Sequence, residues 1–523
     1  FTKLKGTKLF AYITRRIGMM LLIIGGSSFL SYNLMAYSSN PLSVFGESTQ
    51  KNKAFLIKQM IRELQLDVPP PVRFFLWARG AVAGLWGQLN LGKTRNGYTV
   101  LDVIGRAIPI TFRLVIASTI LAIVIGITIG MITAIRQYTR FDYSMTFVSF
   151  LLFSIPIFWV AVLLKLYLAI SFNDFLLNPV VPPEASIIFG LVTGFIISGI
   201  IGGTRKVYFS ILLGVSILVA GLLQLANLTN WFLQPGLGIV GVGVFAFGIA
   251  VLVVQLSTGL ANKRSLTAGL ATAGFVTLAY YPFQLILGKN AGILSVVAIF
   301  SITIFAACVI GNFVEKIDKK VNIRTAVLTA FLATLPVFFD RFMQVFPEYY
   351  NSDGVHGRVV PTLGQSTDIL TDEQRSNFWF SGLDLIMHLI LPTLALTLIS
   401  FAGYVRYSRA SLLEVLNMDY IRTARAKGLN ERTVIMRHAL RNAMLPLTTI
   451  LVNDFAGVIG GAIITEKVFG WKGMGSVFNE ALGNYDLNLF MGVFILGSVL
   501  TVMANLVADL LFGVVDPRIR IRK

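Results

Sequence analysis

The chain has 523 residues, of which 55% are hydrophobic and 13% are charged, and its formal net charge is +19. Its mean hydropathy of +0.75 excludes a soluble enzyme or binding domain and predicts an all-α polytopic membrane protein. The basic residues alternate with apolar segments, so we attribute the charge to membrane orientation and expect no nucleic-acid partner. A single cysteine, Cys308, excludes an internal disulfide framework and a Cys-based metal cluster.

The first apolar segment, residues 17–37, follows a basic N-terminal stretch. This charge pattern is similar to that of a secretory signal peptide. However, the segment is longer than the apolar core of a signal, and no convincing small-residue cleavage site follows it. We therefore predict an uncleaved first span with its N-terminus in the cytoplasm, which places the long polar segment 38–106 on the extracytoplasmic side.

Within that polar segment, Gly87-Gln-Leu-Asn-Leu-Gly92-Lys93-Thr94 matches the phosphate-binding pattern GxxxxGK[ST]. The pattern binds phosphate only between a buried strand and a helix, where backbone N–H groups converge on the anion. No apolar strand precedes it here, and the segment is predicted to face away from cytoplasmic ATP. We favour an ordinary loop over a nucleotide site.

The second and third spans are predicted at residues 112–135 and 143–170. Gly126 and Gly130 form a GxxxG pair, which permits close packing of the second span against another helix. Pro156 should kink the third span and is a candidate for the translocation path. Lys165 lies in the same span, and both interfacial snorkelling and a place in the path remain open for it.

The next part of the chain contains six further apolar runs inside residues 186–340, followed by a polar segment, 341–383. The runs are at 186–203, 207–227, 236–256, 266–287, 291–313 and 323–339. An even number of spans keeps the later part of the chain on its expected side, and basic loops alternate accordingly. These runs are nearly free of ionisable residues, so we expect no transport path in them. A structural collar, a lipid contact and a docking surface all remain open.

A basic stretch, residues 417–446, separates two apolar segments at 385–404 and 445–464. Apolar and small residues recur in it with helical spacing on both sides of a break. Gly428 suits the left-handed position that ends a helix, and Asn430 suits the cap of the next helix. The sequence therefore predicts a compact cytoplasmic helix-turn-helix.

The span that follows this hairpin contains Asn453 and Asp454 near its mid-depth, and a last span is predicted at 489–513. An ionisable residue at that depth is either functional or paired with a neighbour, and both interpretations remain open. Asn453 and Asp454 are candidates for the translocation path.

Several motifs in order resemble the permease subunits of oligopeptide and dipeptide ABC importers. They are His388-Leu-Ile-Leu-Pro392, Tyr404-Val-Arg-Tyr-Ser-Arg-Ala-Ser411, Arg422-Thr-Ala-Arg-Ala-Lys-Gly-Leu429, Glu466-Lys-Val-Phe-Gly-Trp-Lys-Gly-Met-Gly475 and Asp516-Pro-Arg-Ile-Arg520. The third motif resembles the EAA coupling loop of these permeases, with Thr423 in place of the glutamate. The resemblance covers roughly residues 10–175 and 380–523 and leaves 186–340 unexplained.

The resemblance implies a type I ABC importer transmembrane domain with about 12 spans, of which six are family-like and six are inserted. Residues 1–175 and 384–523 would be the two halves of the permease core, 186–340 an inserted block, and 341–383 an extracytoplasmic loop. The chain would lie in a bacterial inner membrane with both termini in the cytoplasm. It would be a non-catalytic subunit without cofactor or metal.

The resemblance also implies partners and coupling residues. The partners would be a second homologous permease, one or two cytoplasmic ATPase subunits, an extracytoplasmic peptide-binding protein and membrane lipid. In the hairpin, Ala424 and Ala426 would face the ATPase groove. The residues implied for coupling are Arg422, Thr423, Ala424, Arg425, Ala426, Lys427, Gly428 and Leu429.

Three alternatives remain at this stage. The same branch of importers includes nickel and glutathione permeases. An ion-coupled secondary transporter often has 12 spans, but it should show repeated halves and paired intramembrane carboxylates, and neither is visible in the sequence. A membrane enzyme would need clustered histidines or acidic residues, whereas the three histidines are scattered.

Overall fold

The computed structural model describes residues 2–38, 41–42, 53–289, 291–314, 319–456 and 462–515. Throughout these ranges the regular structure is helical, with one isolated β-bridge between Lys93 and Thr99. The chain divides into two compact units, one formed by Phe1–Leu164 and Pro392–Lys523 and the other by Lys165–Leu391. We describe each unit by itself.

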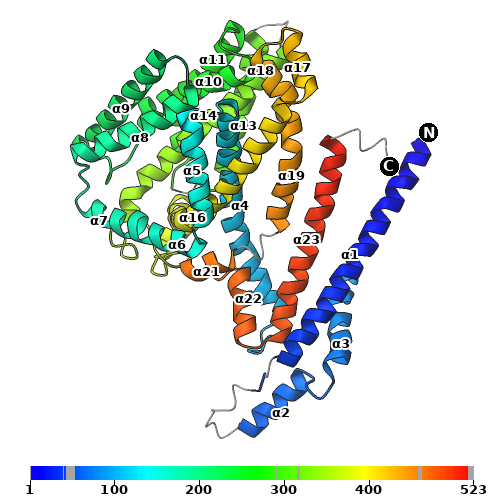
Figure 1. The fold of residues 1–523 in the computed structure, drawn as a ribbon. Coiled ribbons are helices and arrows are strands. Elements are labelled where there is room, and N and C mark those ends of the chain that lie inside the picture. The colour runs from blue at the N-terminus through cyan, green and yellow to red at the C-terminus, as the bar shows by residue number, and fades with distance from the viewer. Residues whose placement is uncertain are drawn as a thin grey trace. The chain divides into compact units, whose positions relative to one another are not determined.

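The first unit contains the two ends of the chain. Its helices are α1 (Thr2–Ser38), α2 (Lys53–Glu63), α3 (Pro70–Val82), η2 (Ala83–Trp86), α4 (Val100–Ile135), α5 (Arg140–Ser154), α6 (Ile157–Leu163), the second half of α16 (Phe378–Leu416), α17 (Asp419–Ala426), α18 (Glu431–Thr433), η4 (Val434–Ala439), α19 (Leu440–Ala456), α21 (Ile463–Phe469), α22 (Met474–Gly483) and α23 (Leu487–Val515). The last of these, α23, packs against α1, α4, α19 and α22 (Figure 1).

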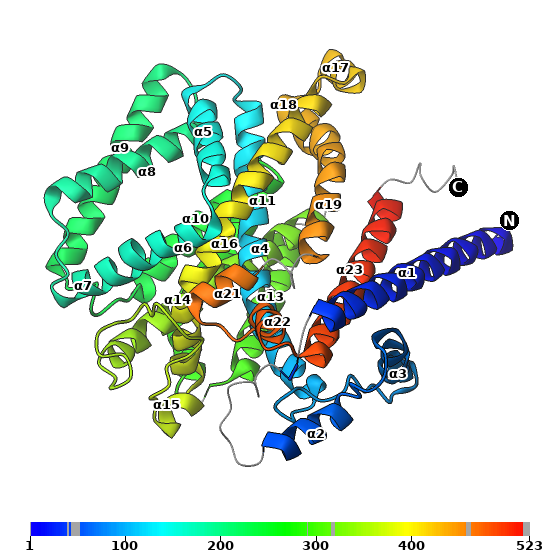
Figure 2. The same ribbon diagram turned by 60° about the horizontal axis from the view of Figure 1, so that its bottom comes forward.

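The second unit contains η3 (Leu164–Ile170), α7 (Ser171–Leu177), α8 (Pro183–Ile201), α9 (Arg205–Leu228), α10 (Gly238–Ser257), α11 (Lys263–Leu278), α12 (Tyr280–Ile286), α13 (Ile293–Val314), α14 (Lys319–Tyr350), α15 (Asp372–Ser376) and the first half of α16. Helices α10, α11, α13 and α14 pack on one another, and α8 packs along α9 (Figure 2). The α8–α9 contact is close because a Cβ at Gly194 would lie 2.6 Å from the Leu212 carbonyl oxygen.

Nine helices in the described ranges are long and apolar enough to cross a membrane. Three further predicted spans are not among these nine, although α23 runs over Leu487–Val515 and so covers the last of them. Residues 266–287 are divided between α11 and α12, the segment 445–464 is described as a helix only to Ala456, and the last span has an apolar stretch described over Leu487–Met503. The all-helical, multi-span membrane architecture predicted from composition is confirmed.

The third predicted span is interrupted rather than kinked. Helix α5 ends at Ser154, and α6 begins after Pro156, which has φ −62° and ψ 143°. A proline lacks an N–H group and forces an extended conformation on the residue before it, here Ile155 with ψ 128°. The apolar helix that follows therefore runs over Ile157–Leu177, and the predicted single helix over 143–170 is wrong. Lys165 is half-buried in η3.

A buried carboxylate joins three helices of the second unit. Asp340 of α14 accepts hydrogen bonds from the Leu237 and Gly238 N–H groups, at 2.6 and 3.1 Å, where α10 begins. It also accepts from the Tyr280 hydroxyl of α12 at 2.5 Å and from Gln344 Nε2 at 2.8 Å. The unpaired N–H groups at a helix start favour a negative charge, so Asp340 caps α10 from a neighbouring helix.

The GxxxG pair of α4 allows close contact with α16, as the sequence predicts. A Cβ at Gly126 would lie 2.6 Å from Tyr404 Cβ, and a Cβ at Gly130 would collide with Ser408 Oγ. Ser408 donates to the Tyr404 carbonyl at 2.6 Å. The two helices can approach to this distance only without side chains at Gly126 and Gly130.

We expect Gly130→Ala to destabilise the folded protein by about 1–3 kcal/mol, because the added methyl group must push α4 away from α16. Gly105→Ala is the matched control, since a Cβ there meets no atom within 4 Å in the same helix. Thermal unfolding in detergent measures both variants. Equal melting temperatures for the two would contradict the close packing of α4 on α16.

Candidate functional site

The predicted helix-turn-helix is present, and its turn has the expected backbone conformation. Helix α17 ends at Ala426, and Gly428 has φ 77° with no atom within 4 Å of an added Cβ. Asn430 caps α18, because its Oδ1 accepts a hydrogen bond from the Thr433 N–H at 2.8 Å. A left-handed residue at this position closes the first helix and reverses the chain direction.

An ion pair connects the two sides of the turn. The Arg425 guanidinium donates through Nη2 to Glu431 Oε1 at 2.6 Å and through Nε to Oε2 at 3.2 Å. These hydrogen bonds hold the pKa of Glu431 below its usual value. Both side chains are largely exposed, so the pair sets the angle of the turn more than it adds stability.

The hairpin has a small apolar core that fastens it to the ends of α4 and α16. Its buried members are Ala134, Leu412, Val415, Ile421, Ala424, Val434, Ala439 and Ala443. Two hydrogen bonds reinforce the core, from Asn442 Nδ2 to the Tyr420 hydroxyl at 2.7 Å and from Ser411 Oγ to the Ala443 carbonyl at 2.8 Å. Figure 2 shows α17 beyond the ends of α16 and α19.

The resemblance implies that Ala424 and Ala426 both face the ATPase groove. The packing of the hairpin places them on opposite sides of α17. Ala424 is only 6% exposed because it lies one helical turn from Ile421 on the buried side of α17. Ala426 lies on the exposed side of the hairpin. Ala424 was expected to face the ATPase groove, but its side chain is part of the hairpin's own apolar core.

The exposed surface of the hairpin combines basic and apolar groups. It comprises Arg422, Thr423, Arg425, Ala426, Lys427, Gly428 and Leu429, together with Met436 of the second arm. Leu429 is 40% exposed and Met436 is 49% exposed. Exposed apolar and basic side chains on a turn closed by a left-handed glycine suit a contact with another protein.

Comparison with known proteins finds similarity to transport-system permeases. Residues 310–521 match the binding-protein-dependent transport system inner membrane component. The oligopeptide transport system permease protein AppB of Bacillus subtilis is 45% identical over 143 residues, which are 27% of this chain and 45% of that protein. The dipeptide transport system permease protein DppB of Escherichia coli is 47% identical over 141 residues, or 27% and 42% of the two chains. Each of these two matches thus spans less than half of the relative.

A third relative matches along almost the entire chain. The oligopeptide transport system permease protein OppB of Mycobacterium tuberculosis is 24% identical over 510 residues, which are 98% of this chain and 99% of that protein. Residues 310–521 of the chain thus match the membrane component of binding-protein-dependent transport systems, and these three relatives are permeases of such systems. It is a multi-pass membrane protein, as the helices of both units indicate.

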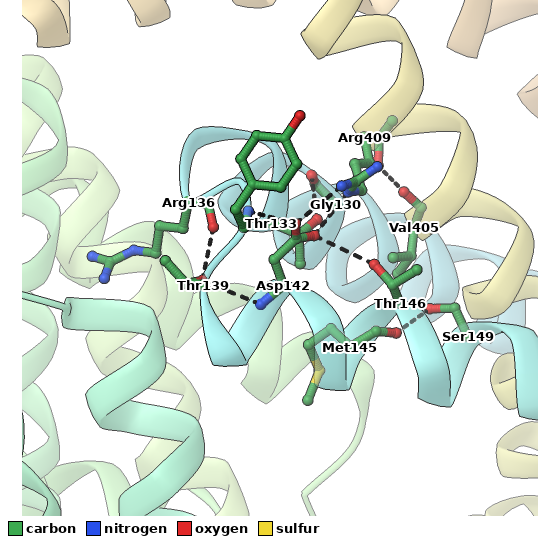
Figure 3. A network of polar contacts seen from close by, with 12 residues as sticks. Gly130, Thr133, Arg136, Thr139, Asp142, Met145, Thr146, Ser149, Val405 and Arg409 are labelled. Carbon is green, nitrogen blue, oxygen red and sulfur yellow. Dashed lines mark hydrogen bonds and ion pairs between the residues drawn. The ribbon is translucent and has the colours of Figure 1, made fainter.

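An ion pair with a buried carboxylate joins α16 to α5 (Figure 3). Arg409 of α16 donates through Nε to Asp142 Oδ1 at 2.8 Å and through Nη2 to Oδ2 at 3.0 Å. Asp142 also accepts from the Tyr138 N–H at 3.0 Å and is 1% exposed. Burial raises the pKa of Asp142, but the hydrogen bonds from Arg409 and Tyr138 outweigh it and hold the pKa below its usual value. The carboxyl is therefore charged at neutral pH.

A second arginine of α16, Arg406, also contacts α5. Arg406, one turn before Arg409, lies with its guanidinium carbon 3.8 Å from the centre of the Phe153 ring and 5.7 Å from that of Phe150. Both rings lie near the end of α5. The cation–π contact thus holds the end of α5 to α16, and the ion pair of Asp142 holds its start. The sequence motif contains both arginines, but nothing in it indicates that Arg409 pairs with Asp142, 267 positions away.

The family-like stretch after the span predicted at 445–464 forms a second buried junction, at Glu466. This carboxylate is fully buried and accepts from the Thr111 hydroxyl at 2.6 Å and from the Ser476 N–H at 2.8 Å. A Cβ at Gly473 would collide with both Glu466 and Thr111. Burial raises the pKa of Glu466, although these hydrogen bonds oppose the rise. The motif thus joins α21 and α22 to α4.

The match to the phosphate-binding pattern is explained by a turn. Gly87 and Gly92 have φ of 80° and 85°, and the Thr94 N–H donates to the Tyr98 carbonyl at 2.8 Å within the turn that the Lys93–Thr99 bridge closes. The segment before Gly87 is the helix η2 and not a strand, so the motif lacks the context that phosphate binding needs.

Two path candidates cannot be placed. Asn453 and Asp454 belong to helix α19, but their side chains lie outside the described residues, as do residues 457–461 and Asp516-Pro-Arg-Ile-Arg520. Pro156 is described and marks the start of α6. These residues remain predictions for the translocation path.

We expect Asp142→Ala to lower the free energy of unfolding by about 3 kcal/mol, because it leaves the Arg409 guanidinium without its buried counter-charge. Asp419→Ala is the control, since Asp419 is exposed and lies 3.8 Å from Arg422. Thermal unfolding of the purified protein measures both. A melting temperature for Asp142→Ala equal to that of the control would show that the pair does not hold α5 to α16.

Proposed function

We propose that the chain is the transmembrane permease subunit of an ATP-driven peptide importer. The observation that carries the proposal is the rigid hairpin of α17 and α18, which presents basic and apolar groups at the end of α16. It is supported by the similarity to permeases named for oligopeptide and dipeptide transport. Peptides are favoured over nickel or glutathione as substrates, and nothing in the structure favours a secondary transporter.

The partners follow from this assignment. The chain forms half of the translocation path with a second homologous permease, and an extracytoplasmic binding protein delivers the peptide. One or two ATPase subunits bind the exposed hairpin surface from the cytoplasm, where both termini of this chain also lie. ATP hydrolysis belongs to those subunits. Membrane lipid surrounds the helices, and the block within 186–340 is an insertion between the halves of the core.

The mechanism rests on how the hairpin is fastened. Its apolar core includes residues of α4 and α16, and Arg409 joins α16 to the start of α5. A displacement of the hairpin by the ATPase is therefore passed to three helices instead of bending a loop. Residues Arg422, Arg425 and Lys427 orient docking through their charge, and Ala426 permits a close approach. Rotation of these helices then opens the path to one side or the other.

The test replaces the left-handed residue of the turn. Gly428→Val strains the backbone by about 1–2 kcal/mol, because a β-branched residue does not adopt φ 77°, while no neighbouring atom is displaced. We expect the variant to assemble in the membrane, to lose most peptide uptake and to hydrolyse ATP without transport. Uptake of labelled peptide and phosphate release by proteoliposomes of the full complex measure the two activities.

Gly428→Asn is the matched control, because asparagine tolerates the left-handed conformation and should retain most uptake. Normal coupling in Gly428→Val would refute the role of the turn. ATP-independent transport by the wild-type chain alone would refute the importer itself.

A further inference from the structure

Helix α3 has apolar residues on all of its sides, although it lies in the segment that the sequence predicts to be polar and extracytoplasmic. It comprises 13 residues, Pro70–Val82, and η2 continues the chain to Trp86. A helix that is apolar all round is stable where protein or membrane covers every side of it. A segment of this length is too short to cross a bilayer, but it suits a helix that enters one leaflet.

One side of α3 packs on the protein. Phe74 is 6% exposed, and its ring centre lies 5.3 Å from that of Phe29 and 5.5 Å from that of Tyr32, both of α1. Trp77 donates through Nε1 to the Leu91 carbonyl at 3.2 Å. Figure 1 shows α3 beside α1. These contacts hold α3 in place, so its other side has a fixed direction.

That other side is exposed and consists of apolar residues around one arginine. We call it the outer stripe, and its members are Val72, Phe75, Leu76, Arg79 and Val82 of α3 and Trp86 of η2. Phe75 is 64% exposed and Trp86 is 76% exposed. The positions recur with helical spacing, so they form one continuous surface. Contiguous exposed apolar side chains mark a surface that contacts something other than water.

The outer stripe is continuous with the exposed surface of a membrane span. The Phe75 ring centre lies 5.9 Å from that of Phe29, which is itself 37% exposed. Phe29 belongs to Gly18–Ser38, a stretch of α1 that is long and apolar enough to cross a membrane. Measured along the helix, Phe29 lies ~14 Å before Ser38. Phe75 therefore lies at a depth where hydrocarbon chains surround the protein.

Arg79 is the cationic member of the outer stripe, and its place along α3 gives it a different neighbour. Phe75 contacts Phe29, whereas the Trp77 ring lies 6.2 Å from Tyr32. Helix α3 thus advances toward the end of α1, and Arg79 lies closer to the membrane surface than Phe75. Its exposed side chain has no ion pair or hydrogen-bond partner among the described residues. An arginine in such a place keeps its stem among apolar groups and its guanidinium at the headgroups.

We propose that α3 and η2 form a re-entrant anchor in one leaflet of the membrane. The apolar members of the outer stripe lie against acyl chains, and Arg79 binds the phosphate of a lipid headgroup. The choice of leaflet rests on the proposed function. Phe74 clusters with Val100 at one end of α4, whereas the hairpin clusters with Ala134 at the other. With the hairpin in the cytoplasm, the anchor lies in the outer leaflet.

Lipid suits the outer stripe better than a protein partner does. A protein that covered the stripe would have to bury the Arg79 guanidinium and provide an acid for it at the same depth. A bilayer provides acyl chains beside Phe75 and phosphate at the level of Arg79 without any such match. The order of the side chains along α3, apolar first and cationic nearer the surface, follows the order of layers in a leaflet.

The test identifies what touches the outer stripe in the complete importer, reconstituted in bilayers that contain phosphatidylglycerol. A photoreactive benzophenone amino acid replaces Leu76 in one variant, and Ile217 or Tyr98 in two reference variants. Ile217 is 72% exposed on the membrane helix α9, and Tyr98 is 67% exposed on the turn before α4. After illumination, mass spectrometry detects the adducts. We expect lipid adducts at Leu76 and at Ile217, and their loss at Tyr98.

Arg79→Gln tests the headgroup contact, and Arg79→Lys is the matched control that retains the charge. We expect Arg79→Gln to bind phosphatidylglycerol about 5-fold more weakly, the effect of one cation at an anionic surface, and Arg79→Lys to change little. Native mass spectrometry of the complex measures the bound lipid. The melting temperature of Arg79→Gln in detergent should match the wild type, since its side chain has no partner in the described part of the chain to lose.

The other outcomes contradict defined parts of the proposal. An adduct of Leu76 with another subunit or with the binding protein would overturn the anchor, because protein would then cover the outer stripe. The absence of any adduct at Leu76 would overturn it as well, because the stripe would face water. Unchanged lipid binding by Arg79→Gln would overturn the role of Arg79. A complex that forms the lipid adduct but takes up no peptide would count against the proposed function and leave the anchor standing.

Discussion

The close contact between α4 and α16 is the constraint on which the first unit depends. Without side chains at Gly126 and Gly130, α4 lies directly against Tyr404 and Ser408, and the buried pair of Asp142 and Arg409 closes the same junction at its end. A buried carboxylate is stable only with a counter-charge and hydrogen bonds, and Asp142 has both. The turn between α4 and α5 is thereby held to α16, and α16 is the helix that directly precedes the hairpin.

Helix α4 connects the two ends of this unit. Near Ala134 it contributes to the hairpin core, and near Val100 it contributes to a cluster with α3, α22 and α23. Between them, Thr111 binds Glu466 and so connects α4 to α21 and α22. Helix α4 therefore joins the hairpin core to the cluster at the other end of the first unit.

The second unit is built differently. Its helices pack through small residues such as Gly190, Gly194 and Gly311, and its buried acid Asp340 has helix N–H groups, a tyrosine and a glutamine as donors. Such a saturated carboxylate stabilises helix packing and offers no free site to a passing ligand. That the block within 186–340 contains no transport path stays a prediction.

The sequence by itself determined the features that depend on neighbouring residues. Hydropathy located the membrane helices, Gly428 and Asn430 defined the turn, and the GxxxG pair indicated close packing. The tertiary structure alone decided that Asp142 meets Arg409, that Ala424 lies inside the hairpin, and that Arg95 meets Asp486 in the α22–α23 connection. Backbone conformation and periodicity are encoded within a few positions, whereas these contacts join residues hundreds of positions apart. They exist only because helices approach one another, and that approach depends on the packing of the entire unit.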